Sequence, residues 1–470
     1  MTAPIAFPSR DDPVVAKVSE IVGGPAGRRA VPGQGWWGPV RVALAVACVV
    51  LGLGFLADAG CRADGWSSRS DRGMWTGLCY SDVAFLYRER GLADGLVYRD
   101  APVEYPVLTG AVMQVSTVLA RTVTGGGVQA QSVRFYDVTA ILMGLAALVT
   151  VVATARTVPR RPWDAMLVAC SPVLLFTATI NWDLLAVCLA SLSIYAWTRE
   201  RPVLTGLFVG LGAAAKLYPA VLLGPLLLVA LRAPDRGRAL RRFLTVAVTA
   251  GLTWVVVNLP VYSWAPDGWR TFFTYNAGRG PEFGSPWYAL DLLRGELLPD
   301  DINGLVLFSA VVLLASIVVL ALVAPKRPRL AQLAFLVVAA LVLVNKVWSP
   351  QYALWLLPLA ALARPRLRDV LIWQVGEMVY FVAVWWHLAT LTEPAQPLIG
   401  APGYAFATAL RIAALGWLVA MVVRDVLGPE HDPVRPYLGP APSSSTTRST
   451  TRVDLGRVVV ESPPEATTSP

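Results

Sequence analysis

The chain has 470 residues, of which 55% are hydrophobic and only 15% are charged, and it contains 17 tryptophans. This composition excludes an ordinary soluble protein, because soluble surfaces carry more charge, and it indicates that lipid is the solvent. The formal net charge of +9 does not indicate nucleic-acid binding, since the arginines fall in short clusters between apolar stretches and not on one basic face.

The two ends of the chain differ in composition from the part between them. Residues 1–41 are rich in Gly, Pro and Arg, and residues 425–470 carry runs of Pro, Ser and Thr. Both ends are predicted to be disordered, because such segments bury too little apolar surface to offset the cost of ordering. The residues before the first apolar stretch do not form a cleavable signal, so that stretch is expected to remain as an anchor. Residues 42–424 are predicted to form one transmembrane domain.

Thirteen apolar stretches lie between the two ends, and several approach the roughly 20 residues that a helix needs to cross a bilayer. They cover residues 42–59, 106–120, 135–155, 163–179, 182–198, 203–217, 218–231, 242–262, 304–324, 330–346, 350–363, 369–389 and 403–423.

The basic clusters between these stretches predict the topology through the positive-inside rule. If residues 106–120 formed a span, every later basic cluster would fall outside. We therefore expect this stretch to be a helix at the outer surface, which leaves about twelve spans, two cytoplasmic ends and two external segments, 60–134 and 263–303. The clusters then all face the cytoplasm: Arg28, Arg29, Arg41, Arg156, Arg160, Arg161, Arg199, Arg201, the arginines of 232–242, the basic residues of 326–329 and 364–368, and Arg424.

The first external segment holds most of the candidate chemistry. It carries Asp82, Tyr87, Tyr98, Glu104 and Tyr105, so that aromatic and acidic side chains alternate along it. Sugar rings pack on aromatic faces, and carboxylates bind or deprotonate hydroxyl groups, so this pattern is typical of a carbohydrate site. A merely solvated, charged loop is the alternative interpretation.

Further polar residues lie between apolar stretches, on the same external side of the membrane as the first external segment. An ionisable side chain at such a depth is a candidate for function, and cations there suit a lipid phosphate, with Arg able to bind it bidentately. A structural ion pair is the alternative interpretation of Asp183 and Lys216, and an aromatic belt would account for Tyr352. Glu377, in the eleventh predicted span, is expected to be buried in a polar contact. The candidates are Asp183, Lys216, Arg279, Lys346, Gln351 and Tyr352.

Metal and cofactor chemistry is not expected. The two histidines, His387 and His431, stand far apart, and no phosphate-cradling GxxxxGK[ST] loop is present. Five cysteines are too few and too scattered for a metal cage or a disulfide framework. Cys61 and Cys79 share the first external segment and either pair in an oxidising compartment or stay as free thiols.

With these residues in view, the chain resembles the GT-C class of membrane glycosyltransferases, and specifically glycosyltransferase family 87, the polyprenyl-phosphate-mannose-dependent type of actinobacteria. The resemblance runs from about residue 42 to 424. It rests on the order and spacing of four stretches: Asp82 with Tyr87 and Gly95 to Tyr98; Glu104-Tyr105-Pro106-Val107-Leu108; Gly206 to Gly212 leading to Lys216-Leu217-Tyr218-Pro219; and Ser349-Pro350-Gln351-Tyr352 leading to Pro358.

The resemblance implies an all-α, GT-C-like bundle with a long first external loop that contains surface helices. It also implies that Asp82 is the catalytic base, while Lys216, Arg279 and Lys346 are expected to bind the donor phosphate. The expected reaction is inverting transfer of a mannosyl or arabinofuranosyl residue from a polyprenyl-phosphate donor to a cell-envelope glycolipid or glycan, outside the plasma membrane. Tyr87, Tyr98, Glu104, Tyr105, Asp183, Gln351 and Tyr352 are the expected substrate-binding residues.

Two other classes of function are alternatives to sugar transfer. A transporter or flippase of lipid-linked sugars should show internal repeats with paired broken helices near the bilayer midplane. The sequence shows no such repeat, and its polar residues gather toward one face. A catalytically inactive scaffold is the third interpretation.

Overall fold

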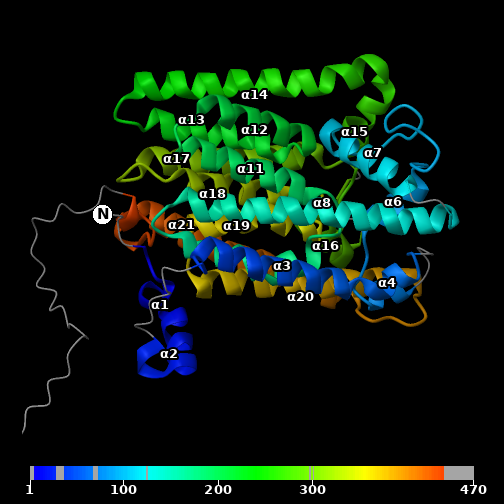
Figure 1. Ribbon diagram of the computed structural model, residues 1–470, viewed down its shortest axis with the longest axis horizontal. Coiled ribbons are helices and arrows are strands. Elements are labelled where there is room, and N and C mark those ends of the chain that lie inside the picture. The colour runs from blue at the N-terminus through cyan, green and yellow to red at the C-terminus, as the bar shows by residue number, and fades with distance from the viewer. Residues whose placement is uncertain are drawn as a thin grey trace, which may run out of the picture. The chain divides into compact units, whose positions relative to one another are not determined.

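The computed structural model describes residues 5–27, 36–66, 72–122, 125–295, 298–299 and 301–438. Within these ranges the regular structure is helical (Figure 1). The protein is therefore an all-α protein, as its sequence predicts.

The main helices begin and end close to the apolar stretches of the sequence. Hydropathy locates these helices, because a helix that faces lipid must be apolar along its length, although α8 and α14 begin with polar turns ahead of their apolar stretches. The helices are α3 Pro39–Ala57, α7 Val107–Arg121, α8 Gly127–Thr157, α11 Asp183–Thr198, α12 Pro202–Ala215, α13 Leu223–Leu231, α14 Arg236–Trp264, α17 Asn303–Val323, α18 Leu330–Val344, α19 Ala353–Ala363, α20 Leu367–Thr392 and α21 Ala401–Leu427.

Five of these helices, α3, α8, α14, α17 and α21, are long and apolar enough to cross a membrane, and several shorter helices are apolar as well. The predicted span 163–179 differs from the expectation. It is broken into η1 (Pro162–Ala165), α9 (Met166–Ala169) and α10 (Pro172–Thr177). Ser171 caps α10 by accepting hydrogen bonds from the backbone of Val173 and Leu174, and Pro172 has no N–H with which to continue a helix.

The expected surface helix α7 lies at one end of the bundle, beside α6 (Asp82–Glu89) and α15 (Pro266–Gly278) (Figure 1). Both of its termini are held at that end. The Thr109 hydroxyl donates to the carbonyl of Ala215, and the Arg134 side chain donates to the carbonyl of Ala120. Helix α7 therefore does not run the length of the bundle, which agrees with the topology that the basic clusters predict.

Buried ion pairs connect the helices at the opposite end of the bundle, where α20 begins and α21 ends (Figure 1). Arg364 bonds both Asp369 and Asp425, and Arg329 bonds Asp432. These arginines come from clusters that the sequence assigns to the cytoplasm. Because each is matched by buried carboxylates, the clusters also fix the loops that connect the helices.

The two ends of the chain are more ordered than their composition predicts. Helices α1 (Pro8–Asp11) and α2 (Pro13–Gly27) occupy part of the N-terminal segment, and Asp12 accepts a hydrogen bond from the backbone of Leu367. The C-terminal segment continues through η4 (Pro429–His431) and η5 (Arg435–Tyr437). Hydrogen bonds of acidic side chains such as Asp12 attach these segments to the bundle. Amino-acid composition does not reveal such contacts. Residues 28–35 and 439–470 lie outside the described residues.

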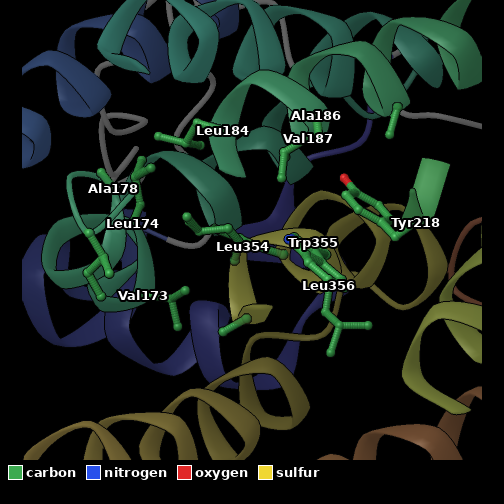
Figure 2. Close-up of a cluster of buried hydrophobic side chains, with 14 of the residues drawn as sticks. Val173, Leu174, Ala178, Leu184, Ala186, Val187, Tyr218, Leu354, Trp355 and Leu356 are labelled. Carbon is green, nitrogen blue, oxygen red and sulfur yellow. The ribbon is translucent and has the colours of Figure 1, made fainter. Parts of the chain in front are cut away.

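A buried apolar cluster lies where α10, α11 and α19 meet (Figure 2). Leu174, Val187 and Leu354 fill it, and the rings of Tyr218 and Trp355 stack with centroids 4.5 Å apart at its edge. This packing fixes the start of α19, whose Trp355 reaches the polar site described below.

Candidate active site

A cavity of about 530 Å³ opens at the end of the bundle that carries α6 and α15. It combines aromatic walls with seven ionisable acidic and basic side chains. Its lining includes Trp75, Tyr80, Asp82, Glu89, Arg90, Glu104, Tyr105, Lys216, Tyr275, Arg279, Glu282, Gln351, Tyr352 and Trp385. Among the described residues, no group of three or more His, Cys, Asp or Glu side chains is arranged to hold a metal ion.

Asp82 is the first residue of α6, and its backbone is fixed on both sides. Ser81 caps the helix by accepting a hydrogen bond from the backbone of Val83, and the backbone N–H of Asp82 donates to the carbonyl of Ile180 over 2.8 Å. The Asp82 carboxylate accepts a 2.7 Å hydrogen bond from the Tyr80 hydroxyl and a 3.4 Å hydrogen bond from the Tyr105 hydroxyl. The carboxylate is thus held at the cavity wall with one tyrosine on each oxygen.

Several effects act on the pKa of Asp82. Burial raises it, the hydrogen bond from Tyr80 and the charge of Lys216 lower it, and the net result is a pKa above the ordinary value. A carboxylate with a raised pKa is a stronger base than an exposed aspartate, which suits proton abstraction.

Lys216 follows the end of α12, where Pro219 prevents the helix from continuing. Its ammonium group lies 2.6 Å from an oxygen of Asp183. It also lies over the rings of Tyr105, Tyr352 and Trp355, at 5.3–5.6 Å from their centroids. The aromatic faces and the carboxylate together stabilise a cation at the cavity wall.

Asp183 lies behind Lys216 and not on the cavity surface. Its side chain is only 1% exposed, and its second oxygen accepts a 2.9 Å hydrogen bond from the Trp355 indole. The pairing that the sequence left open as a structural alternative is therefore present. Lys216 nevertheless lines the cavity, so the pair does not remove it from the site.

Arg279 lines the cavity from the segment that follows α15. It forms a bidentate ion pair with Glu282, with Nε 2.6 Å from one carboxylate oxygen. The backbone of Glu282 donates to the carbonyl of Lys346 over 2.8 Å. This segment is therefore anchored to the connection between α18 and η3 (Pro350–Tyr352), which carries Gln351 and Tyr352 into the cavity lining.

The structure places Lys346 outside the cavity, contrary to the expectation that it binds the donor. Its ammonium group donates to the carbonyls of Asn276 and Ala277 and to the side chain of Asn303, at 2.8–3.2 Å. These acceptors terminate α15 and begin α17. Lys346 thus fixes the loop that bears Arg279, and it contacts the site only through that loop.

Tyr87 and Tyr98 are also outside the lining. The Tyr87 hydroxyl donates to Gln131, and the Tyr98 hydroxyl donates to the carbonyl of Tyr105. A Cβ at Gly110 would lie 2.2 Å from the Tyr98 hydroxyl, so only glycine leaves room for this ring. Tyr98 therefore supports the backbone of Tyr105.

Glu104 lines the cavity and forms a bidentate ion pair with Arg90, with both N–O distances at 2.9 Å. Sequence reasoning identified Glu104 but not Arg90. The two residues lie 14 positions apart on either side of an irregular loop, so their spacing carries no periodic signal.

The lining also contains aromatic residues that sequence reasoning did not identify, among them Trp75 and Trp385. Trp75 belongs to the short helix α5 (Arg72–Thr76), which packs against α20, the helix of Trp385. A disulfide between Cys61 and Cys79 closes this part of the first external segment. Of the two alternatives for these cysteines, the structure therefore shows the paired one.

Buried Arg411 links the site to α20 and α21. It pairs with Glu377 at 2.7 Å and donates to the carbonyls of Trp348 and Ser349. Glu377 also accepts a hydrogen bond from the Trp373 indole, so its predicted burial in a polar contact is confirmed. Arg411 thereby fixes the turn before Gln351.

Replacing Arg411 by Met should lower the free energy of unfolding by about 3–5 kcal/mol, because Glu377 would remain as a buried, unpaired carboxylate. Thermal unfolding of the purified variant measures the loss. The double variant R411M/E377L should regain most of it, and no recovery would show that the carbonyl contacts, and not the ion pair, carry the stability.

Comparison with known proteins identifies the family. The model of glycosyltransferase family 87 matches residues 105–345, more than half of the chain. The chain belongs to glycosyltransferase family 87. The protein is accordingly a glycosyltransferase and a multi-pass membrane protein. The matched part of this family 87 protein includes Tyr105, Asp183, Lys216 and Arg279, whereas Asp82 precedes it.

Comparison with curated proteins finds no match. Among solved structures, the family 87 chain is similar to ArnT from Cupriavidus metallidurans, whose crystal structure contains undecaprenyl phosphate. The identity is 16%, the similarity covers 83% of this chain and 78% of that chain, and the TM-score is 0.40.

Proposed function

We propose that this family 87 glycosyltransferase transfers a mannosyl or arabinofuranosyl residue, with inversion, from a polyprenyl-phosphate donor to a cell-envelope glycolipid or glycan. One observation carries the proposal. A single cavity is lined both by a carboxylate suited to act as a base, Asp82, and by two cationic side chains, Lys216 and Arg279.

The proposed reaction needs one base and stabilisation of one leaving group. An acceptor hydroxyl loses its proton to Asp82 and attacks the anomeric carbon of the donor sugar. The bond from that carbon to the phosphate oxygen breaks as the new glycosidic bond forms, and the polyprenyl phosphate departs with both electrons. Lys216 and Arg279 stabilise the negative charge that develops on the phosphate. The sugar phosphate bond supplies the driving force, so no nucleotide is required.

We place this chemistry on the extracytoplasmic side of the plasma membrane, with both chain ends in the cytoplasm. Two features support this orientation. The end that bears the cavity also carries the Cys61–Cys79 disulfide, and disulfides persist in oxidising compartments. The buried arginines lie in the connections before α18 and between α19 and α20, at the end of the bundle opposite the cavity, as the positive-inside rule requires of a cytoplasmic face.

The direct test supplies the protein, purified into nanodiscs, with radiolabelled decaprenyl-phosphate mannose or decaprenyl-phosphate arabinose and an envelope lipid extract. Transfer of label into a glycolipid or glycan from either donor supports the proposal. Absence of transfer from both donors, with label instead moved across the bilayer of proteoliposomes, would favour a flippase.

The pH dependence of transfer should report the raised pKa of Asp82. The carboxylate is the active form, so kcat/KM should be full above this pKa and fall as the pH drops through it. The acid limb should therefore lie above the pH at which an exposed aspartate titrates. Tyr80→Phe removes a hydrogen bond that lowers the pKa and should move the limb to higher pH. A limb at the ordinary aspartate value in the wild type would contradict the assignment.

A further inference from the structure

Three stacked aromatic rings form a distinct part of the cavity wall. The Trp75 and Tyr80 rings stack with centroids 4.9 Å apart, and Trp385 lies 5.7 Å from Trp75 and 5.1 Å from Tyr80. All three residues line the cavity. They come from α5, from the linker before α6 and from α20, so three separate segments converge to build one aromatic surface.

A second aromatic cluster also contacts Asp82. It consists of Tyr105, Tyr352 and Trp355, the rings that surround the Lys216 ammonium group. The two clusters meet at the Asp82 carboxylate, because Tyr80 donates to one of its oxygens and Tyr105 to the other. The base is therefore hydrogen-bonded both to the cluster that surrounds the Lys216 cation and to the cluster formed by Trp75, Tyr80 and Trp385.

In-line displacement assigns different substrates to the two clusters. The attacking hydroxyl and the leaving phosphate lie on opposite faces of the anomeric carbon, so a phosphate beside Lys216 leaves the Trp75, Tyr80 and Trp385 rings for the acceptor. We propose that Trp75, Tyr80 and Trp385 form a platform on which a pyranose ring of the acceptor stacks. This inference rests on the proposed function, and it specifies the acceptor as a carbohydrate.

The chemistry of the platform fits a sugar. Tyrosine and tryptophan faces pack against the C–H face of a pyranose, and their polar edges suit its hydroxyls. The indole N–H groups of Trp75 and Trp385 donate no hydrogen bond within the described part of the chain. Both indole nitrogens are fully buried, so a sugar would contact the parts of these rings that line the cavity and not their N–H groups.

The platform is also rigidly supported. The Cys61–Cys79 disulfide ends one residue before Tyr80, and the Trp66 indole donates to the carbonyl of Cys79 over 2.9 Å. Trp385 is only 4% exposed and is fixed within α20. A surface that is ordered before the ligand arrives loses little conformational entropy on binding.

The test measures sugar binding separately from transfer. Octyl α-mannopyranoside, octyl β-glucopyranoside and octyl β-galactopyranoside are added to the protein in nanodiscs, and saturation-transfer NMR records contacts to the sugar ring protons. The wild type should give ring-proton signals with at least one probe. Trp75→Ala and Trp385→Ala should each lower the signal at least threefold, while Trp75→Phe, which keeps an aromatic face, should lower it less.

Trp386→Ala is the matched control. Trp386 is the next residue on α20, it is 39% exposed, and it lines an apolar groove on a different face of the helix. This variant should bind the probes as the wild type does, and thermal unfolding of each variant shows whether the bundle is intact.

Outcomes for the platform and for the function are distinct. Ring signals unchanged in folded W75A and W385A, or absent for every pyranoside in the wild type, would overturn the platform even if transfer occurs. Ring signals that depend on Trp75 and Trp385 in a protein that transfers neither mannose nor arabinose would leave the sugar platform in place and contradict the proposed function.

Discussion

Replacing Asp82 by Asn should lower the rate of sugar transfer about 10²–10⁴-fold, which is the usual contribution of a general base. Asparagine keeps the shape of the side chain, and its one amide oxygen can still accept the hydrogen bond from Tyr80, while its –NH2 group can donate to the Tyr105 hydroxyl, which accepts in place of donating. The variant should therefore fold normally and bind both substrates, while the acceptor hydroxyl keeps its proton. Transfer of radiolabelled mannose or arabinose to the envelope extract measures the effect, and kcat should fall with little change in KM.

Glu89→Gln is the control for this experiment. Glu89 lines the same cavity from the last turn of α6, but it is exposed and one helix length away from Asp82. Its replacement should change transfer only severalfold. Equal loss in both variants would indicate an electrostatic effect of the cavity as a whole, and full activity of D82N would remove Asp82 from the role of base.

The fold could be predicted from the sequence because a lipid environment imposes a simple rule. Helices that face lipid must be continuously apolar, so hydropathy locates α3, α8, α14, α17 and α21 within a few residues, apart from polar extensions such as the first turns of α8 and α14. The same rule fails where protein surrounds the chain. Residues 163–179 are apolar enough for a span, but most of them are buried against neighbouring helices, which allows the helix to break before Pro172.

The site was only partly predictable, for a different reason. Asp82, Glu104, Tyr105, Lys216 and Arg279 stand in or beside polar stretches that interrupt apolar ones, and the structure brings these residues to one cavity. The type of a residue does not show whether its side chain lines the cavity or instead holds the backbone of the residues that line it. Lys346 and Tyr98 carry suitable groups, but these groups satisfy backbone carbonyls.

Contacts between distant segments account for the residues that sequence reasoning missed. Trp385 lies in an apolar helix, where tryptophan is unremarkable, and it joins the site only because α5 packs against α20. Arg411 is more than 60 residues from the turn that it holds. Neither contact leaves a periodic or local pattern in the sequence.

The Lys216–Asp183 pair allows the structural and the functional interpretations of Lys216 to be separated. Replacing Lys216 by Met should lower the free energy of unfolding by about 3–5 kcal/mol, because the Asp183 carboxylate is almost fully buried and would lose its counter-ion. The double variant K216M/D183L replaces both charges by apolar groups of similar volume. It should recover most of the stability, since a buried pair contributes little net free energy over an apolar isostere.

Transfer activity should not recover with stability. If Lys216 stabilises the charge on the departing phosphate, its removal costs about 10²–10³-fold in kcat, and both K216M and K216M/D183L should show this loss. Thermal unfolding and transfer assays on the same preparations provide the two measurements. A double variant that regains both stability and activity would mean that Lys216 serves only to neutralise Asp183. If K216M/D183L is as stable as the wild type but inactive, the Lys216 ammonium group takes part in the reaction. Its charge would then be needed for the anionic phosphate and not for the fold.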